Sequence, residues 1–395
     1  MSAYNAAAGD NDFGFGLLSQ VEKGKNAAIS PYNIRSALAM LYEGAVGETA
    51  KEIAAVAGFA ENLLDHRLAF LSLINSINKD KVYTLNKDRY FLRSANGLWI
   101  AENYPIQVAY VANATLAYHA NISKADFRNN ANGVRDEINS WVSKETENKI
   151  TELFPANSLN RDTILAIASA LYFKGQWDAK FSPEHTQKQD FTLAGGEKVQ
   201  VEMMRKGALE MTRGGLPKFQ YTEFDGAQVV ALPYQGKEIM KVVLLPPQGE
   251  TVDNLVAELQ RQQKSITALT SSMVNEDFSR LELPKHEVRG DYKLIPLLQG
   301  MGIERMFSQQ NAQFDGITGQ ERLYVSSGVH KTFFKTDEEG SEGAAATGFG
   351  VARTTSIQRP KIPKEFVANR PFLEAVVHQA TGSVLFLNRI ENPRN

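Results

Sequence analysis

The chain has 395 residues, a hydrophobic content of 43% and no cysteine, and its 43 Lys and Arg nearly balance its 45 Asp and Glu, for a formal net charge of -2. The near-neutral charge removes the electrostatic basis for binding nucleic acid or an anionic membrane, so we expect neither as a partner. The lack of cysteine excludes disulfides, thiolate catalysis and cysteine-based metal sites.

The N-terminal sequence MSAYNAAAGDNDFGFGLL does not contain the basic segment and apolar core of a secretory signal. We therefore expect a cytoplasmic protein, with an extracellular location as the alternative if a signal was removed. Apolar segments are spread from end to end, which favours one large domain over residues 1–395 rather than two or three.

The first 80 residues predict helices. Ser30 is a good N-cap residue, and Pro31 suits the first helical position because its missing N–H would be unpaired there in any case. Thr49 and Glu52 have the spacing of a capping box for a second helix. A third helix is expected at 61–79.

The run Thr163 to Phe173 is almost continuously apolar, which predicts a strand buried on both faces at the centre of a sheet. Strand signals begin near Tyr90. The remaining expected elements are helices at 106–118, 132–149, 252–270 and 291–301, and strands at 189–247, 323–336 and 366–390.

Motifs for catalysis or cofactor binding are not evident. The chain has no GxSxG elbow and no P-loop, and HEVRG at His286 lacks the second histidine of a zinc helix. We expect no metal and no cofactor. A Ser-His-Asp triad assembled by folding stays open, because its members need not be close in sequence.

Segment 336–363 differs from the rest of the chain, because it is rich in small residues and lies between two strong strand signals. A flexible surface loop is one interpretation. The other is a segment able to become a strand, since one face would carry no charge and could be buried. The residues of that face are Ser341, Gly343, Ala345, Thr347, Phe349 and Val351.

The same segment resembles a known family. DEEGSEGAAAT at 337–347 is similar to the hinge of inhibitory serpins. Further similarities follow in family order along nearly the whole chain. They are NAAISPYNIRSALAMLYEGAVGETAKEI (26–53), SALYFKGQWDAKF (169–181), MGIERMF (301–307), SSGVHKTFFKTDEEG (326–340), FVANRPF (366–372) and SVLFLNRI (383–390).

This resemblance implies an α+β fold with three β-sheets, eight or nine helices and an exposed reactive loop at about 337–362. It also implies a monomer that inhibits a protease as a suicide substrate. The protease cleaves the loop and forms an acyl-enzyme, and the loop then inserts into the main sheet. Two alternatives remain: a non-inhibitory serpin acting as carrier, store or chaperone, and a hydrolase with an unrecognised triad.

The resemblance also assigns residues in the reactive loop. The hinge comprises Glu338, Glu339, Gly340, Ser341, Glu342, Gly343, Ala344, Ala345, Ala346 and Thr347. Family spacing places the reactive bond at Thr354-Thr355. Arg353-Thr354 is slightly favoured, because trypsin-like proteases read an Arg through an acidic pocket. A trypsin-like serine protease is thus the favoured target, with an elastase-like or a cysteine protease as alternatives.

Two further groups match places where the family's main sheet opens. Trp177, Lys285 and Glu338 match the breach, in which the latter two form an ion pair. Ser30, Asn33, Ser169 and His330 match a polar cluster called the shutter. In the shutter, Asn33 stands where Ser is usual and Ser169 where Asn is usual. Asn388 replaces a common Gly, and we attach no function to it.

Overall fold

The computed structural model describes residues 5–77, 90–211, 215–319, 323–341 and 362–394. Nine α-helices lie within these residues, in agreement with the expected eight or nine. They are α1 (Gly9–Gln20), α2 (Pro31–Tyr42), α3 (Gly47–Ala57), α4 (Leu63–Ile77), α6 (Val108–Tyr118), α7 (Phe127–Glu145), α8 (Val252–Arg261), α9 (Ile266–Ser271) and α10 (Leu294–Gly300).

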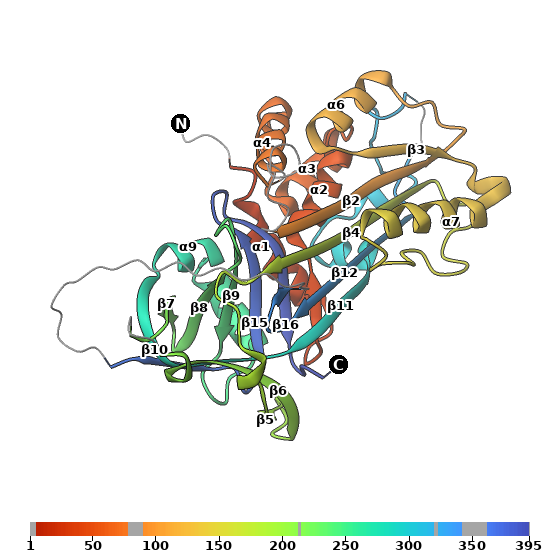
Figure 1. The fold of residues 1–395 in the computed structure, drawn as a ribbon. Coiled ribbons are helices and arrows are strands. Elements are labelled where there is room, and N and C mark those ends of the chain that lie inside the picture. The colour runs from red at the N-terminus through yellow and green to blue at the C-terminus, as the bar shows by residue number, and fades with distance from the viewer. Residues whose placement is uncertain (1–4, 78–89, 212–214, 320–322, 342–361, 395) are drawn as a thin grey trace.

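The main sheet has six strands (Figure 1). Its strand order is β11 (His286–Lys293), β12 (Ser327–Thr336), β4 (Leu165–Gln176), β2 (Tyr90–Ala101) and β3 (Asn121–Ala125), and the two-residue strand β13 (Gly340–Ser341) also pairs with β4. Strand β4 contains the apolar run predicted to be central. It pairs with β12 on one side and β2 on the other, and all but two of its residues are buried.

The other strands form two ladders that share the long strand β10 (Val274–Pro284). One contains β1 (Ala27–Ile29), β16 (Ser383–Ile390), β15 (Phe372–His378), β9 (Ile239–Leu245), β8 (Ala227–Pro233) and β7 (Lys218–Phe224). The other contains β6 (Lys198–Gly207), β5 (Gln187–Thr192) and β14 (Lys364–Val367). With the main sheet, these make the three expected sheets, two of them joined through β10.

Helix α2 connects the sheets because it is buried over its whole length and contacts β2, β4 and β16. Its start confirms the prediction from Ser30 and Pro31: the Ser30 side chain accepts a hydrogen bond from the Asn33 amide at 3.0 Å. Helix α7 packs across β2 on the other face of the main sheet (Figure 1).

The capping box predicted at Thr49 and Glu52 is wrong. Helix α3 begins at Gly47, three residues before the start that a Thr49 cap would give, and Gln313 from a distant loop bonds its first turn. The Gln313 side-chain oxygen accepts from the Glu48 amide at 3.0 Å, while the Thr49 hydroxyl accepts from the Gln313 amide at 3.1 Å. Tertiary contact thus replaces the local motif. The helix expected at 252–270 is two helices, α8 and α9.

None of the helices in the described ranges combines the length and apolar character that crossing a lipid bilayer would require.

Candidate functional site: the hinge and the opening of the main sheet

The site lies where two neighbouring strands of the main sheet separate. Strands β4 and β12 are parallel and paired from Ser327–Ala166 to Phe333–Tyr172. Beyond Phe333, β12 is paired only with β11, as far as the pair Thr336–His286. A chain that reverses after Thr336 would therefore run antiparallel to both β12 and β4, in the space where they diverge.

The chain does reverse there, in a tight turn from Asp337 to Gly340. The Asp337 amide donates to the Gly340 carbonyl at 2.9 Å, and the Gly340 amide donates to the Asp337 carbonyl at 3.3 Å. Gly340 has φ 151°, and a Cβ atom there would lie 2.0 Å from the Gly175 carbonyl oxygen. Only glycine fits this turn.

After the turn, the first two residues of β13 have already joined the sheet. Gly340 pairs with Gln176 and Ser341 with Gly175, antiparallel to β4. Ser341 is fully buried, and its hydroxyl shares a hydrogen bond of 2.7 Å with the Tyr234 hydroxyl. The structure thus places predicted hinge residues 338–341 at the end of the main sheet. Predicted hinge residues 342–347 and the reactive-bond candidates Arg353, Thr354 and Thr355 lie outside the described residues.

Trp177 forms one wall of this opening. Its indole N–H donates to the Asp337 carbonyl and its amide donates to the Glu339 carbonyl, both at 2.9 Å. Its ring stacks on Tyr234, with centroids 4.6 Å apart and an interplanar angle of 12°. Trp177 therefore ties the end of β4 to the hinge backbone.

The predicted breach ion pair is present. Lys285 Nζ lies 3.1 Å from Glu338, and the Thr186 hydroxyl donates to the same carboxylate at 2.8 Å. Burial alone would raise the pKa of Glu338, but hydrogen bonds from Thr186, the backbone and Lys285 bring that pKa below its usual value. The carboxylate is charged at neutral pH. It attaches the hinge to Lys285, the residue between β10 and β11.

The four shutter residues also meet, between α2, β4 and β12. The Ser30 amide donates to His330 Nε2 at 3.1 Å, so the ring proton lies on Nδ1, which donates to the Ser169 hydroxyl at 3.0 Å. Burial lowers the pKa of His330 to about 3, so the ring is neutral at physiological pH. Because β12 and β4 pair at His330–Ser169, this hydrogen bond joins two strands that would have to separate for a new strand to insert between them.

The exchanged residue types in the shutter preserve the link between α2 and β4. The Asn33 amide group donates to the Ser169 hydroxyl at 2.9 Å, and its carbonyl oxygen accepts from Asn96 on β2 at 2.9 Å. Asn96 and Tyr234 were missed from the sequence. Asn96 could have been found as the one polar side chain in the buried second half of β2, residues 95–101, whereas Tyr234 has no comparable signal.

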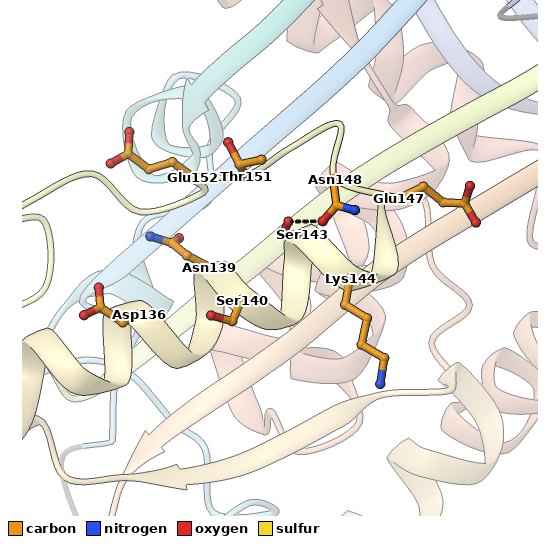
Figure 2. A pocket seen from close by; sticks show the side chains of 9 residues that line it. All are labelled: Asp136, Asn139, Ser140, Ser143, Lys144, Glu147, Asn148, Thr151 and Glu152. Carbon is orange, nitrogen blue, oxygen red and sulfur yellow. Dashed lines mark hydrogen bonds between the residues drawn. The ribbon is translucent and has the colours of Figure 1, made fainter.

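A hollow of about 830 Å³ lies away from the hinge, along α7 and the turn that follows it (Figure 2). Its lining is polar, with Asp136, Lys144 and Glu152 among the nine residues, and it includes no histidine. Asn139 accepts from the Leu153 and Phe154 amides, so it fastens the turn to the helix. Across the described part of the chain, no three His, Asp or Glu side chains are grouped to hold a metal ion.

Comparison with known proteins gives a consistent result. Residues 8–393 match the family model described as Serpin (serine protease inhibitor). An uncharacterized serpin-like protein of Methanosarcina acetivorans is 32% identical over 393 residues, which cover 99% of this chain and 87% of the relative. The leukocyte elastase inhibitor of Xenopus tropicalis is 33% identical over 397 residues, which cover 98% of this chain and 100% of the relative.

Solved structures agree with these sequence matches. The crystal structure of Serpin48 from the insect Tenebrio molitor superposes with a TM-score of 0.82 at 26% identity, covering 98% of both chains.

Proposed function

The chain belongs to the serpin family, and from this premise we propose that it inhibits a target protease as a suicide substrate whose cleaved loop enters the main sheet. Serpins are protease inhibitors and not enzymes, so the prediction that the chain is not an enzyme is confirmed by its family, and the hydrolase alternative has no support.

One observation carries the proposal: Gly340 and Ser341 are already paired with β4. Continued one for one, the same register would bring Thr347 opposite Ser169 and Val351 opposite Leu165, the first residue of β4. The segment from Gly340 to Val351 therefore has the length of β4. Because β13 runs antiparallel to β4, and β4 is parallel to β12, the continued segment would pair antiparallel with both neighbours.

The composition of that segment suits insertion. Ser341 faces the buried side of the sheet, and so would every second residue after it, none of which is charged. Ordering a residue costs about 1–2 kcal/mol, and a central strand gains up to about two hydrogen bonds per residue at roughly 0.5–1.5 kcal/mol each. These two terms nearly cancel. The free energy of insertion therefore depends on the burial of Phe349 and Val351 and on the release of strain in the native sheet.

Insertion of this segment would displace an attached protease by roughly 40 Å, at about 3.3 Å per residue. The acyl bond would pull on the catalytic serine and distort the oxyanion hole. Loss of one oxyanion-hole donor slows hydrolysis by roughly 100- to 1000-fold, so the acyl-enzyme would persist.

A trypsin-like serine protease is the target we favour, because Arg353 is adjacent to the family's reactive-bond position. The relative named leukocyte elastase inhibitor supports a protease as the partner in general and keeps an elastase-like enzyme as the alternative. A non-inhibitory serpin is disfavoured by the uncharged face of the hinge.

Incubation of the protein with trypsin-, elastase- and papain-like proteases tests the proposal. We expect at least one of them to form a denaturant-resistant complex, and the mass of the released C-terminal fragment identifies the cleaved bond. Clean cleavage by every enzyme with no complex would contradict inhibition and favour the non-inhibitory alternative.

A further inference from the structure

Four buried polar side chains meet beneath the breach, and the site described so far does not account for them. Glu374 on β15 accepts from Lys241 Nζ on β9 at 2.8 Å and from the Asn388 amide group on β16 at 2.9 Å. His286 Nε2 on β11 lies 3.2 Å from the same carboxylate. At most 5% of any of the four residues is exposed. The cluster therefore joins β9, β15 and β16 to β11, the edge strand of the main sheet.

General stability does not explain the charges in this cluster. The residues beside Lys241 and Glu374 in their strands are apolar and buried, so apolar residues at these two positions would extend the core. Replacing a buried ion pair with apolar residues is often neutral or stabilising. Burial alone would raise the pKa of Glu374, but Lys241, His286 and the hydrogen bond from Asn388 hold that pKa well below its usual value. Burial lowers the pKa of Lys241, and the charged Glu374 carboxylate opposes that shift and holds the Lys241 amino group in place.

The ammonium group of Lys241 contacts both sides of the opening. It donates to the hydroxyl of Thr336, the last residue of β12 and the one that precedes the hinge turn. It also lies over the ring of Phe334 on β12, 4.7 Å from the centroid, and over that of Trp177 at the end of β4, 5.6 Å from the centroid. Lys241 thus sits where β12 and β4 separate.

We infer that Lys241, held by Glu374, is a positioning residue that clamps Thr336 to Trp177 and thereby restrains the hinge and the opening of the main sheet. His286 and Asn388 keep Glu374 oriented toward Lys241. His286 is suited to this because it pairs directly with Thr336 in the β11–β12 ladder. The inference rests on the proposed function only in that sheet opening is the step being restrained.

The test is hydrogen–deuterium exchange of the intact protein at the amides of Trp177 and Gly340, which donate to hinge carbonyls. Thr336→Val keeps the shape of the side chain but removes the oxygen that Lys241 binds, whereas Thr336→Ser keeps an oxygen. Thr49→Val is the matched control: Thr49 is also fully buried and its hydroxyl accepts from the Gln313 amide, but it lies on α3, away from the hinge.

We expect Thr336→Val to speed exchange at both amides about tenfold. Loss of a hydrogen bond to a charged group should increase the equilibrium constant for local opening by about a factor of ten. Thr336→Ser and Thr49→Val should exchange at these amides as the wild type does. Unchanged exchange in Thr336→Val, or the same increase in Thr49→Val, would overturn the inference.

A second variant separates positioning from simple structural support. Lys241→Met combined with Glu374→Gln removes both charges without leaving one unpaired, and the Gln oxygen can still accept from the Asn388 amide group. We expect an unfolding temperature close to that of the wild type with faster exchange at Trp177 and Gly340. Unfolding at a lower temperature with no selective change at these amides would contradict the clamp. Neither readout depends on trapping a protease, so failure of the protease panel is distinguishable from failure of the clamp.

Discussion

The hydroxyl of Ser341 lies 2.7 Å from the hydroxyl of Tyr234, in a fully buried environment beneath the main sheet. The hinge has thus entered the sheet by two residues while the pairs from Ser327–Ala166 to Phe333–Tyr172 remain closed. Insertion of the rest of the loop would continue a strand that has already begun.

Ser341→Arg should turn the inhibitor into a substrate. A charged side chain at a fully buried position would have to be desolvated next to Tyr234, which is costly, so insertion would slow. We expect the target protease to cleave the variant and be released without a stable complex, as followed by denaturing gel electrophoresis. Ser341→Ala, which is small and uncharged, should still inhibit. Full inhibition by the Arg variant would show that the hinge register is wrong.

Glu338→Gln should weaken the breach pair only slightly. Lys285 is 32% exposed and Glu338 11%, so the pair is worth at most about 1 kcal/mol, or a decrease of roughly 1–3 °C in the unfolding temperature. Because the pKa of Glu338 is lower in the folded state, its stabilisation is present above pH about 4.3 and is lost as the pH falls through the folded value.

The control for this prediction is Glu202→Gln. Glu202 lies 3.5 Å from the same Lys285 but is 59% exposed, so its removal should have little effect. Equal decreases for both variants at neutral pH would contradict a specific role for Glu338.

The exchanged shutter residues should behave as a coupled pair. Asn33→Ser alone removes the donor to Ser169 and the acceptor for Asn96, and Ser169→Asn alone adds volume to a filled site. Each single variant should be destabilised by about 1–3 kcal/mol. The double variant should recover at least about 1 kcal/mol of the summed loss in a urea-unfolding cycle. Strictly additive losses would show that the two residues do not act together.

Much of the fold could be predicted because its signals are local. The unbroken apolar run at Thr163–Phe173 predicted the central strand β4, and Ser30 with Pro31 predicted the start of α2. The capping box at Thr49 failed for the opposite reason: the true cap comes from Gln313, and no local pattern shows which distant residue will arrive there.

The site shows the same division. The hinge, breach and shutter residues could be identified from motifs, but the pairing of Ser341 with Gly175 and its contact with Tyr234 depend on strand register, which the sequence alone does not determine. Lys241 and Glu374 did leave a signal that we did not use: each is the one charged residue in an otherwise apolar strand, IMKVVLL and FLEAVVH with its terminal His.

The free energy of unfolding should decrease as the pH falls, and His330 should account for part of that decrease. Its folded pKa is about 3, below the unfolded value of about 6.5, so its neutral form stabilises the fold above pH 6.5 and that stabilisation is lost as the pH falls toward 3. The slope is up to about 1.4 kcal/mol per pH unit. His66, whose pKa burial lowers to about 3, adds to the loss in the same pH range.

His330→Gln isolates the contribution of one ring. Urea-unfolding free energies between pH 4 and pH 7 should vary less steeply in the variant than in the wild type. Equal slopes would mean that His330 is not held neutral by burial.

The central claim is that the native sheet is metastable and that the segment from Gly340 to Val351 can complete it. The most direct measurement is the thermal unfolding of the intact protein beside the protein nicked once within 348–358. We expect the nicked form to unfold at a temperature higher by about 5 °C or more, since several kcal/mol would be gained at roughly 1–2 °C each in a chain of this length. A nicked form that unfolds at or below the temperature of the intact protein would contradict the account.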